Sequence, residues 1–193
     1  MSDFDSYAHD YQATLHRGLA VSGEDATFFA RERVAWLSRC LKENGFTPDT
    51  ILDFGCGTGS ATPFFFEILD AESVVGVDLS AESLTVARTD HAKLAVEYKL
   101  ADEYQPHGTI DLAFSNGVFH HIPPTDRTAA VRYIAASLRP GGLFALWENN
   151  PWSPAARYVM RRIPFDQDAV MVWPGEARLG RARQGEARRG KVY

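Results

Sequence analysis

Apolar runs of strand length recur along the chain and alternate with segments of helical spacing. The runs begin at Ile51, Ser73, Ala95, Thr109 and Leu143. Between the fourth and fifth runs, apolar residues of 125–138 fall at i, i+3, i+4 and i+7, which predicts one buried helix face. These residues are Val131, Ile134, Ala135 and Leu138. Strands that alternate with helices through short links predict an α/β fold, with a mainly parallel sheet and helices on both faces.

The amino-terminal part of the chain carries two further helical patterns. Residues 22–25 supply a serine cap and first-turn acids, and an apolar stripe follows as far as Gly45. The stripe consists of Ala30, Val34, Leu37 and Leu41. Upstream of it, Phe4, Tyr7 and Tyr11 are spaced i, i+3 and i+7, which favours a packing stripe.

The first apolar run leads into three glycines, Gly55, Gly57 and Gly59. Glycine lets the backbone turn tightly and approach a ligand closely, so the pattern predicts a nucleotide-binding loop. Pro63 suits the first turn of the helix that follows, and Thr62 is expected to cap it.

The spacing of the loop separates two kinds of nucleotide site. The dinucleotide pattern GxGxxG requires glycine or alanine at position 60, which is Ser60 here. Asp53 also interrupts a strand that should be continuously apolar. An acid followed by GxGxG resembles the first motif of the class I S-adenosylmethionine-dependent methyltransferases. The resemblance implies a Rossmann-like fold, and it implies that Asp53, Gly55, Gly57 and Gly59 bind S-adenosylmethionine.

The second and third runs also end in acids. Asp78 lies about 20 residues beyond the loop, where a carboxylate can accept both hydroxyl hydrogens of a ribose, whether of NAD or of S-adenosylmethionine. Alternatively, Asp78 binds no ligand and is only an acid in the turn that leads into the helix capped by Ser80. The resemblance implies that Asp78 holds the ribose, that Leu79 lies against the adenine, and that Asp102 reaches the adenine amino group. Glu103 competes with Asp102 for that role.

The fourth run ends at Asn116 and Gly117 and is followed by His120 and His121. This stretch resembles the fourth motif of the same family, which implies that Asn116 lies at the cofactor site. A histidine is well suited to accept a proton near neutral pH. Neighbouring side chains outside a helix point in different directions, so we expect one catalytic base, His121 in the first place and His120 in the second. The alternative is that both histidines are structural.

These candidate residues should lie together, because ligands of parallel α/β sheets bind at the carboxyl ends of the strands. The resemblance predicts transfer of a methyl group from S-adenosylmethionine to an oxygen or nitrogen of a small-molecule acceptor. A non-catalytic cofactor-binding module derived from a methyltransferase is one alternative. An NAD-dependent oxidoreductase is the other, and Ser60 and Asp53 disfavour it.

Composition narrows the class of protein. The chain has 193 residues with 45% hydrophobic and 23% charged residues, which is typical of a globular domain. It shows neither a signal peptide nor a long apolar run, so we expect a cytoplasmic protein without a membrane partner. Cys40 and Cys56 lack metal-ligand spacing, and no metal cofactor is expected.

The carboxyl end departs from the family pattern. After residue 177 the strand signals stop, so the family's last two strands are expected to be missing and the exposed sheet edge favours a homodimer. Residues 178–193 hold six of the 20 basic and one of the 25 acidic residues, so the rest of the chain is acidic, which argues against a nucleic-acid partner. The resemblance implies that the amino-terminal segment closes over the cofactor as a lid, where Tyr7 or Tyr11 can touch the acceptor. The predicted units are this lid and a helix (1–45), a cofactor-binding core (46–150), a substrate-side segment (151–177) and the basic tail.

Overall fold

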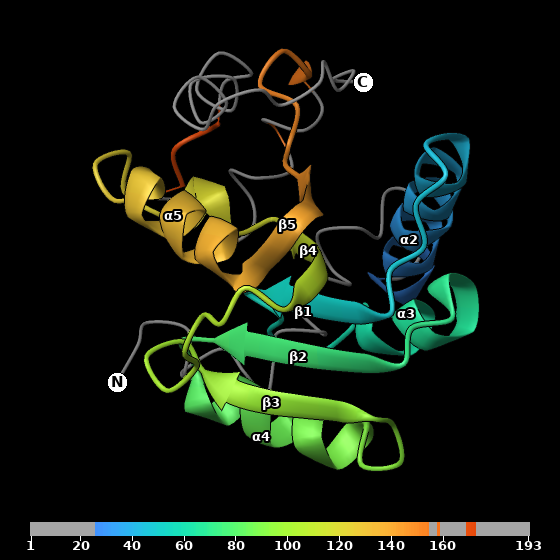
Figure 1. The fold of residues 1–193 in the computed structure, drawn as a ribbon. Coiled ribbons are helices and arrows are strands. Elements are labelled where there is room, and N and C mark those ends of the chain that lie inside the picture. The colour runs from blue at the N-terminus through green and yellow to red at the C-terminus, as the bar shows by residue number, and fades with distance from the viewer. Residues whose placement is uncertain (1–25, 155–157, 159–168, 173–193) are drawn as a thin grey trace.

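The computed structural model describes residues 26–154, 158 and 169–172. In this part of the chain, strands and helices alternate as the sequence predicts (Figure 1). The elements are α2 (Ala26–Glu43), β1 (Thr50–Phe54), α3 (Thr62–Leu69), β2 (Ser73–Asp78), α4 (Ala81–Asp90), β3 (Val96–Leu100), β4 (Ile110–Asn116), the 3₁₀ turn η2 (Phe119–His121), α5 (Arg127–Ser137) and β5 (Leu138–Trp147).

The five strands form one sheet in the order β3-β2-β1-β4-β5, and every pairing is parallel. The predicted parallel α/β sheet is therefore confirmed. The chain builds outward from β1 to β3 and then returns to place β4 on the other side of β1. Loops after β1 and β4 consequently diverge to opposite faces of the sheet, and a crevice at such a point is the usual ligand site of this architecture.

Alternate side chains of the central strands enter two separate cores. Ile51 of β1 and Phe114 of β4 pack with α2 and α3 on one face. Leu52 of β1 and Ala113 of β4 pack on the other face, together with Ile134 of α5. The two-residue period of a strand places neighbouring residues on opposite faces, so helices cover both sides of the sheet (Figure 1).

Helix α2 presents the predicted apolar stripe to the core. All four of its residues are buried: Ala30, Val34, Leu37 and Leu41. The predicted start of this helix at residues 22–25 lies outside the described residues. Ser80 caps α4 as expected, since its hydroxyl accepts a hydrogen bond from the amide of Ser83 at 3.1 Å.

The predicted cap of α3 is wrong. Ala61 occupies the cap position without a side-chain hydrogen bond, and Thr62 is already helical. The Thr62 hydroxyl is buried and accepts a hydrogen bond from the Tyr98 hydroxyl at 2.8 Å. A buried partner on a neighbouring strand therefore holds the side chain that the sequence suggested as a cap. Pro63 does lie in the first turn, as predicted.

The boundary between α5 and β5 also differs from the prediction. We expected helix to Leu138 and strand from Leu143, but the helix ends at Ser137 and the strand begins at once. Ile110 pairs with Leu138 and Leu112 with Leu143, so residues 139–142 bulge out of the ladder. Pro140 in this bulge has no amide hydrogen to give to a ladder, which is consistent with its place there.

A structural acid, Asp111, lies at the end of the sheet where the strands begin. Asp111 accepts hydrogen bonds from the amides of Asp49 at 3.0 Å and Thr50 at 2.8 Å, and it pairs with Arg139. Burial raises the pKa of Asp111, but hydrogen bonds from Arg139 and Thr50 outweigh that effect and hold the pKa below its usual range. This carboxylate ties β4 to the start of β1.

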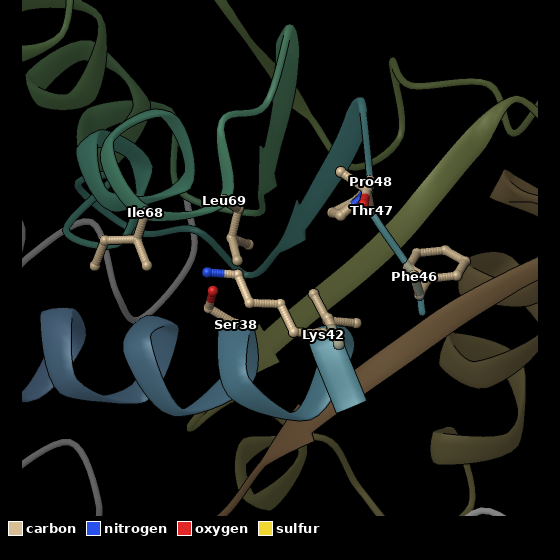
Figure 2. A pocket seen from close by; sticks show the side chains of 8 residues that line it. Ser38, Lys42, Phe46, Thr47, Pro48, Ile68 and Leu69 are labelled. Atoms are coloured by element: carbon tan, nitrogen blue, oxygen red, sulfur yellow. The ribbon is translucent and has the colours of Figure 1, made fainter. Parts of the chain in front are cut away.

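A small hollow lies at the same amino-terminal edge. Figure 2 shows Ser38 and Lys42 of α2 beside Leu69 of α3, and Phe46 and Pro48 are among the other residues that line the hollow. None of the residues that the sequence marks for catalysis or cofactor binding lines this hollow. It therefore belongs to the packing of α2 against α3, at the edge of the sheet opposite the candidate site.

Two expectations concern parts of the chain that the structure describes only partly. Beyond β5, residues 148–154, 158 and 169–172 contain no strand. Residues 173–193, on which the prediction of missing strands also rests, lie outside the described residues. None of the helices described is both long enough and apolar enough to cross a membrane.

Candidate functional site

The glycine loop between β1 and α3 lies at the carboxyl edge of the sheet. The amides of Gly55 and Cys56 donate hydrogen bonds to the carbonyl of Val77 on β2, at 2.8 and 3.1 Å. Gly55 has a φ of 74°, and a Cβ there would lie 2.3 Å from a methyl group of Val118. A side chain at position 55 would therefore push the loop away from the segment that follows β4.

The middle glycine faces a different environment. Gly57 also has a positive φ, of 53°, but a Cβ at this position would meet no heavy atom within 4 Å. The backbone of the loop is thus exposed on this side. Such a surface lets a ligand approach the peptide groups closely, which is the role that the sequence pattern predicts.

Asp78 connects the glycine loop to the start of α4. One carboxylate oxygen accepts a hydrogen bond from the amide of Gly57 at 2.8 Å, and the other accepts one from the amide of Ser80 at 2.9 Å. The next residue, Leu79, exposes 72% of its surface. An acid and an exposed apolar side chain therefore lie side by side at the end of β2, as a ribose and an adenine would require.

Asp53 is a buried acid beneath the loop. Burial raises the pKa of Asp53 to about 8, and the negative charge of Asp78 adds to the shift. Burial therefore favours the protonated form of this side chain near neutral pH. A nearby cation would favour its ionised form, and S-adenosylmethionine carries such charges on its amino group and its sulfur.

The raised pKa of Asp53 makes stability depend on pH. The folded protein keeps the proton of the Asp53 carboxyl group up to about pH 8, whereas the unfolded chain releases it at about pH 4. Stability of the ligand-free protein should therefore fall as the pH rises between these values. We expect Asp53→Asn to be more stable than wild type by at least about 1 kcal/mol at high pH. Urea unfolding should show this gain above pH 8 and its loss near pH 4, and a less stable variant at high pH would contradict the assignment.

Two further predicted residues end strands at the same edge. Asp102 follows β3 and is exposed, and Asn116 is the half-buried last residue of β4. Glu103, the competitor of Asp102, turns back so that one of its oxygens lies 3.4 Å from the amide of Leu100. The geometry therefore leaves Asp102 as the better placed of the two acids to contact a ligand.

The two histidines differ in their surroundings. His120 is buried, with 4% of its side chain exposed, and its Nδ1 lies 2.6 Å from a carboxylate oxygen of Glu148, whose side chain is 9% exposed. His121 is half-buried, and its ring centroid lies 4.1 Å from that of His120. The structure thus gives His120 an acidic partner, whereas the sequence favoured His121 as the base.

A buried arginine supports the turn that carries both histidines. The Nε of Arg127 donates to the carbonyls of Phe119 and Ile122, each at 3.1 Å, and another of its nitrogens donates to the carbonyl of Val170. The amide of Val170 in turn donates to the carbonyl of His120 at 2.8 Å. Arg127 therefore joins η2 to a segment that lies about 50 residues later in the sequence.

Sequence reasoning missed Glu148 and Arg127. Glu148 directly follows β5, much as Asp78 ends β2, so the same argument from strand ends could have found it. Arg127 lies in an amphipathic helix, where nothing in the pattern separates it from a solvated residue. Tyr7 and Tyr11 lie outside the described residues, so their predicted role as a lid stays a prediction.

The residues present fit S-adenosylmethionine. The open space beside Gly57, the carboxylate of Asp78 and the exposed side chain of Leu79 lie together at the carboxyl ends of β1 and β2. Asp53 supplies a buried acid whose ionisation a positively charged ligand would favour. These four residues offer contacts for the amino acid, ribose and adenine parts of the molecule.

Comparison with known proteins agrees with this geometry. Residues 51–142 match the family described as a methyltransferase domain. The chain is 35% identical over 136 residues to a trans-aconitate 2-methyltransferase of Azoarcus sp. (strain BH72), an alignment that covers 69% of this chain and 49% of the relative. The chain spans about half the length of the curated relatives it matches.

Solved structures share the fold. The YcgJ protein of Bacillus subtilis matches with a TM-score of 0.59 and 21% identity, over 77% of this chain and 65% of that one. CalS10 of Micromonospora echinaspora, an amino pentose methyltransferase solved with S-adenosylmethionine bound, matches with a TM-score of 0.57 and 23% identity, over 75% of this chain and 57% of that one. Sequence motifs, sheet order and relatives agree, and the chain belongs to the class I S-adenosylmethionine-dependent methyltransferase family.

Proposed function

We propose that this chain transfers a methyl group from S-adenosylmethionine to an oxygen or nitrogen of a small-molecule acceptor. The observation that carries the proposal is the position of Asp78, whose carboxylate lies between the glycine loop and the start of α4 at the end of β2. Relatives named trans-aconitate 2-methyltransferase support a small acceptor.

The proposed cofactor contacts come from residues at the carboxyl ends of the strands. Asp78 accepts hydrogen bonds from the ribose hydroxyls, and Leu79 packs against the adenine while Asp102 accepts a hydrogen bond from its amino group. Gly55, Gly57 and Gly59 bring the backbone close to the amino acid part, and Asp53 and Asn116 provide polar contacts beside it. Tyr7 and Tyr11 are proposed to close over the acceptor.

Proximity and proton removal are what the protein contributes to the reaction. When bound, S-adenosylmethionine supplies a methyl carbon: a lone pair of the acceptor forms the new bond to carbon while the carbon–sulfur pair stays on sulfur. Residues at the carboxyl ends of the strands would orient the two reactants, and such orientation by itself gives a large acceleration. A histidine of η2 takes the proton that the acceptor oxygen or nitrogen loses. The geometry favours His120 for this role, with His121 second.

An acceptor panel tests the proposed function. Release of S-adenosylhomocysteine should be measured with alcohols and phenols, with amines, and with polycarboxylates that include trans-aconitate. Turnover of at least one small molecule, confirmed by mass of the methylated product, is the expected result. Methylation of a protein or nucleic acid and of no small molecule would contradict the proposal. Binding of S-adenosylhomocysteine without any turnover would favour the non-catalytic binding module.

A further inference from the structure

The carboxylate of Glu148 makes contacts with both the backbone and the ring of the histidine turn. Its Oε1 accepts hydrogen bonds from the amides of Val118 at 3.0 Å and Phe119 at 2.7 Å. Its Oε2 lies 2.6 Å from Nδ1 of His120. One side chain thus fixes the residues just before His120 and the orientation of the imidazole at the same time.

The sheet register explains why Glu148 reaches this place. Asn116, the last residue of β4, pairs with Trp147, the last residue of β5. The amide of Gly117 then donates to the carbonyl of Trp147 at 2.9 Å. Glu148 is therefore the first residue beyond the paired strands and lies beside the point where β4 turns into η2. A shift of one residue in this register would turn its side chain to the other face.

The hydrogen bond between these side chains determines where the imidazole carries its proton. An ionised carboxylate only accepts hydrogen bonds, so the short contact requires a hydrogen on Nδ1 of His120. In a neutral imidazole, a hydrogen on Nδ1 leaves the lone pair on Nε2. Because both side chains are buried, this hydrogen bond is weakly screened by water.

We propose that Glu148 is a positioning residue that holds His120 in the tautomer with hydrogen on Nδ1, so that Nε2 is the atom that accepts the acceptor's proton. This inference rests on the proposed methyl transfer. It also narrows the acceptor: a carboxylate carries no proton at neutral pH and needs no base. A Glu148–His120 pair is useful only for an acceptor with an O–H or N–H group, such as an alcohol, a phenol or an amine.

Glu148→Gln tests the role of the carboxylate with little change in shape. If the amide oxygen of the glutamine accepts from Val118 and Phe119, its NH₂ group faces Nδ1 of His120. Nδ1 must then accept a hydrogen bond, and the hydrogen of the imidazole moves to Nε2. The variant should therefore keep the turn while it reverses the tautomer. In a serine protease the corresponding exchange of the orienting acid lowers turnover by about 10⁴-fold.

The measurement is nitrogen-15 NMR of the full chain with labelled histidine, at about pH 8, above the usual histidine pKa of about 6.5. His120→Gln and His121→Gln spectra identify the two signals among the six histidines. In wild type we expect a protonated Nδ1 and an unprotonated Nε2 at His120, and the reverse in Glu148→Gln. The tautomer of His121 and the affinity for S-adenosylhomocysteine should not change, and Glu72→Gln should match wild type.

Wild-type protein with hydrogen on Nε2 of His120, or on both nitrogens, would overturn the inference, because Nε2 could not then accept a proton. An unchanged tautomer in a folded Glu148→Gln protein would overturn it as well. When the assay uses an O–H or N–H acceptor that the wild type methylates, kcat of Glu148→Gln should be at least about tenfold lower, at unchanged KM for the cofactor. Failure of wild type to bind S-adenosylhomocysteine would instead refute the proposed function. The tautomer of His120 found by NMR would not be affected by that result.

Discussion

Replacement of Asp78 by alanine is expected to weaken the binding of S-adenosylhomocysteine at least about tenfold. Its carboxylate can accept hydrogen bonds from both ribose hydroxyls, and a hydrogen bond to a charged group contributes about 1.5–3 kcal/mol, where about 1.4 kcal/mol is a tenfold change. The same carboxylate holds the amides of Gly57 and Ser80. The variant therefore also loses part of the support of the glycine loop. Isothermal calorimetry measures the change.

Glu72→Ala is the matched control for this variant. Glu72 is an exposed acid just before β2, whereas Asp78 ends the same strand. Glu72→Ala therefore removes one negative charge at the opposite end of the strand. Its affinity for S-adenosylhomocysteine should equal that of wild type. Undiminished affinity in a folded Asp78→Ala protein would remove the central cofactor contact from the proposal.

His120→Ala is expected to lower the turnover of an O–H or N–H acceptor by about 10²–10⁴-fold, which is the usual contribution of a general base. Cofactor affinity should stay near that of wild type, because the proposed cofactor contacts lie on β1, on the glycine loop and at the ends of β2, β3 and β4, and none lies on η2. The measurement is kcat for release of S-adenosylhomocysteine with the acceptor found in the panel, together with calorimetry of cofactor binding.

His121→Ala is the comparison that decides between the two histidines. His121 is half-buried and its ring lies tilted beside that of His120, with centroids 4.1 Å apart, so we expect a smaller loss of turnover. A larger loss in His121→Ala than in His120→Ala would restore His121 as the base. Full activity in both variants would mean that methyl transfer here depends on proximity alone.

The sheet could be predicted because its signals are local. Each strand is an apolar run with a glycine or an acid at its end, and the stripe of α2 falls at helical spacing. The errors occur where a distant partner decides the local structure. Thr62 is a good cap by type, but the hydroxyl of Tyr98 on β3 holds it inside the helix. Leu138 continues the helical stripe of α5, but Ile110 pairs with it in the sheet.

The site could be predicted only in part for a similar reason. Parallel strands bring their carboxyl ends to one edge, so Asp78, Asp102 and the two histidines could be expected there from the order of elements alone. The choice between His120 and His121 depends on which ring meets Glu148. That contact follows from the β4–β5 register, which the hydrophobic pattern of these two strands does not specify.

Calorimetric titration of the whole chain with S-adenosylhomocysteine and, separately, with NADH tests the central claim most directly, because the glycine spacing and Asp78 must select one nucleotide cofactor over the other. We predict saturable binding of one S-adenosylhomocysteine per chain and no measurable binding of NADH at the same concentration. Binding of NADH in preference to S-adenosylhomocysteine, or binding of neither by the folded chain, would contradict the account.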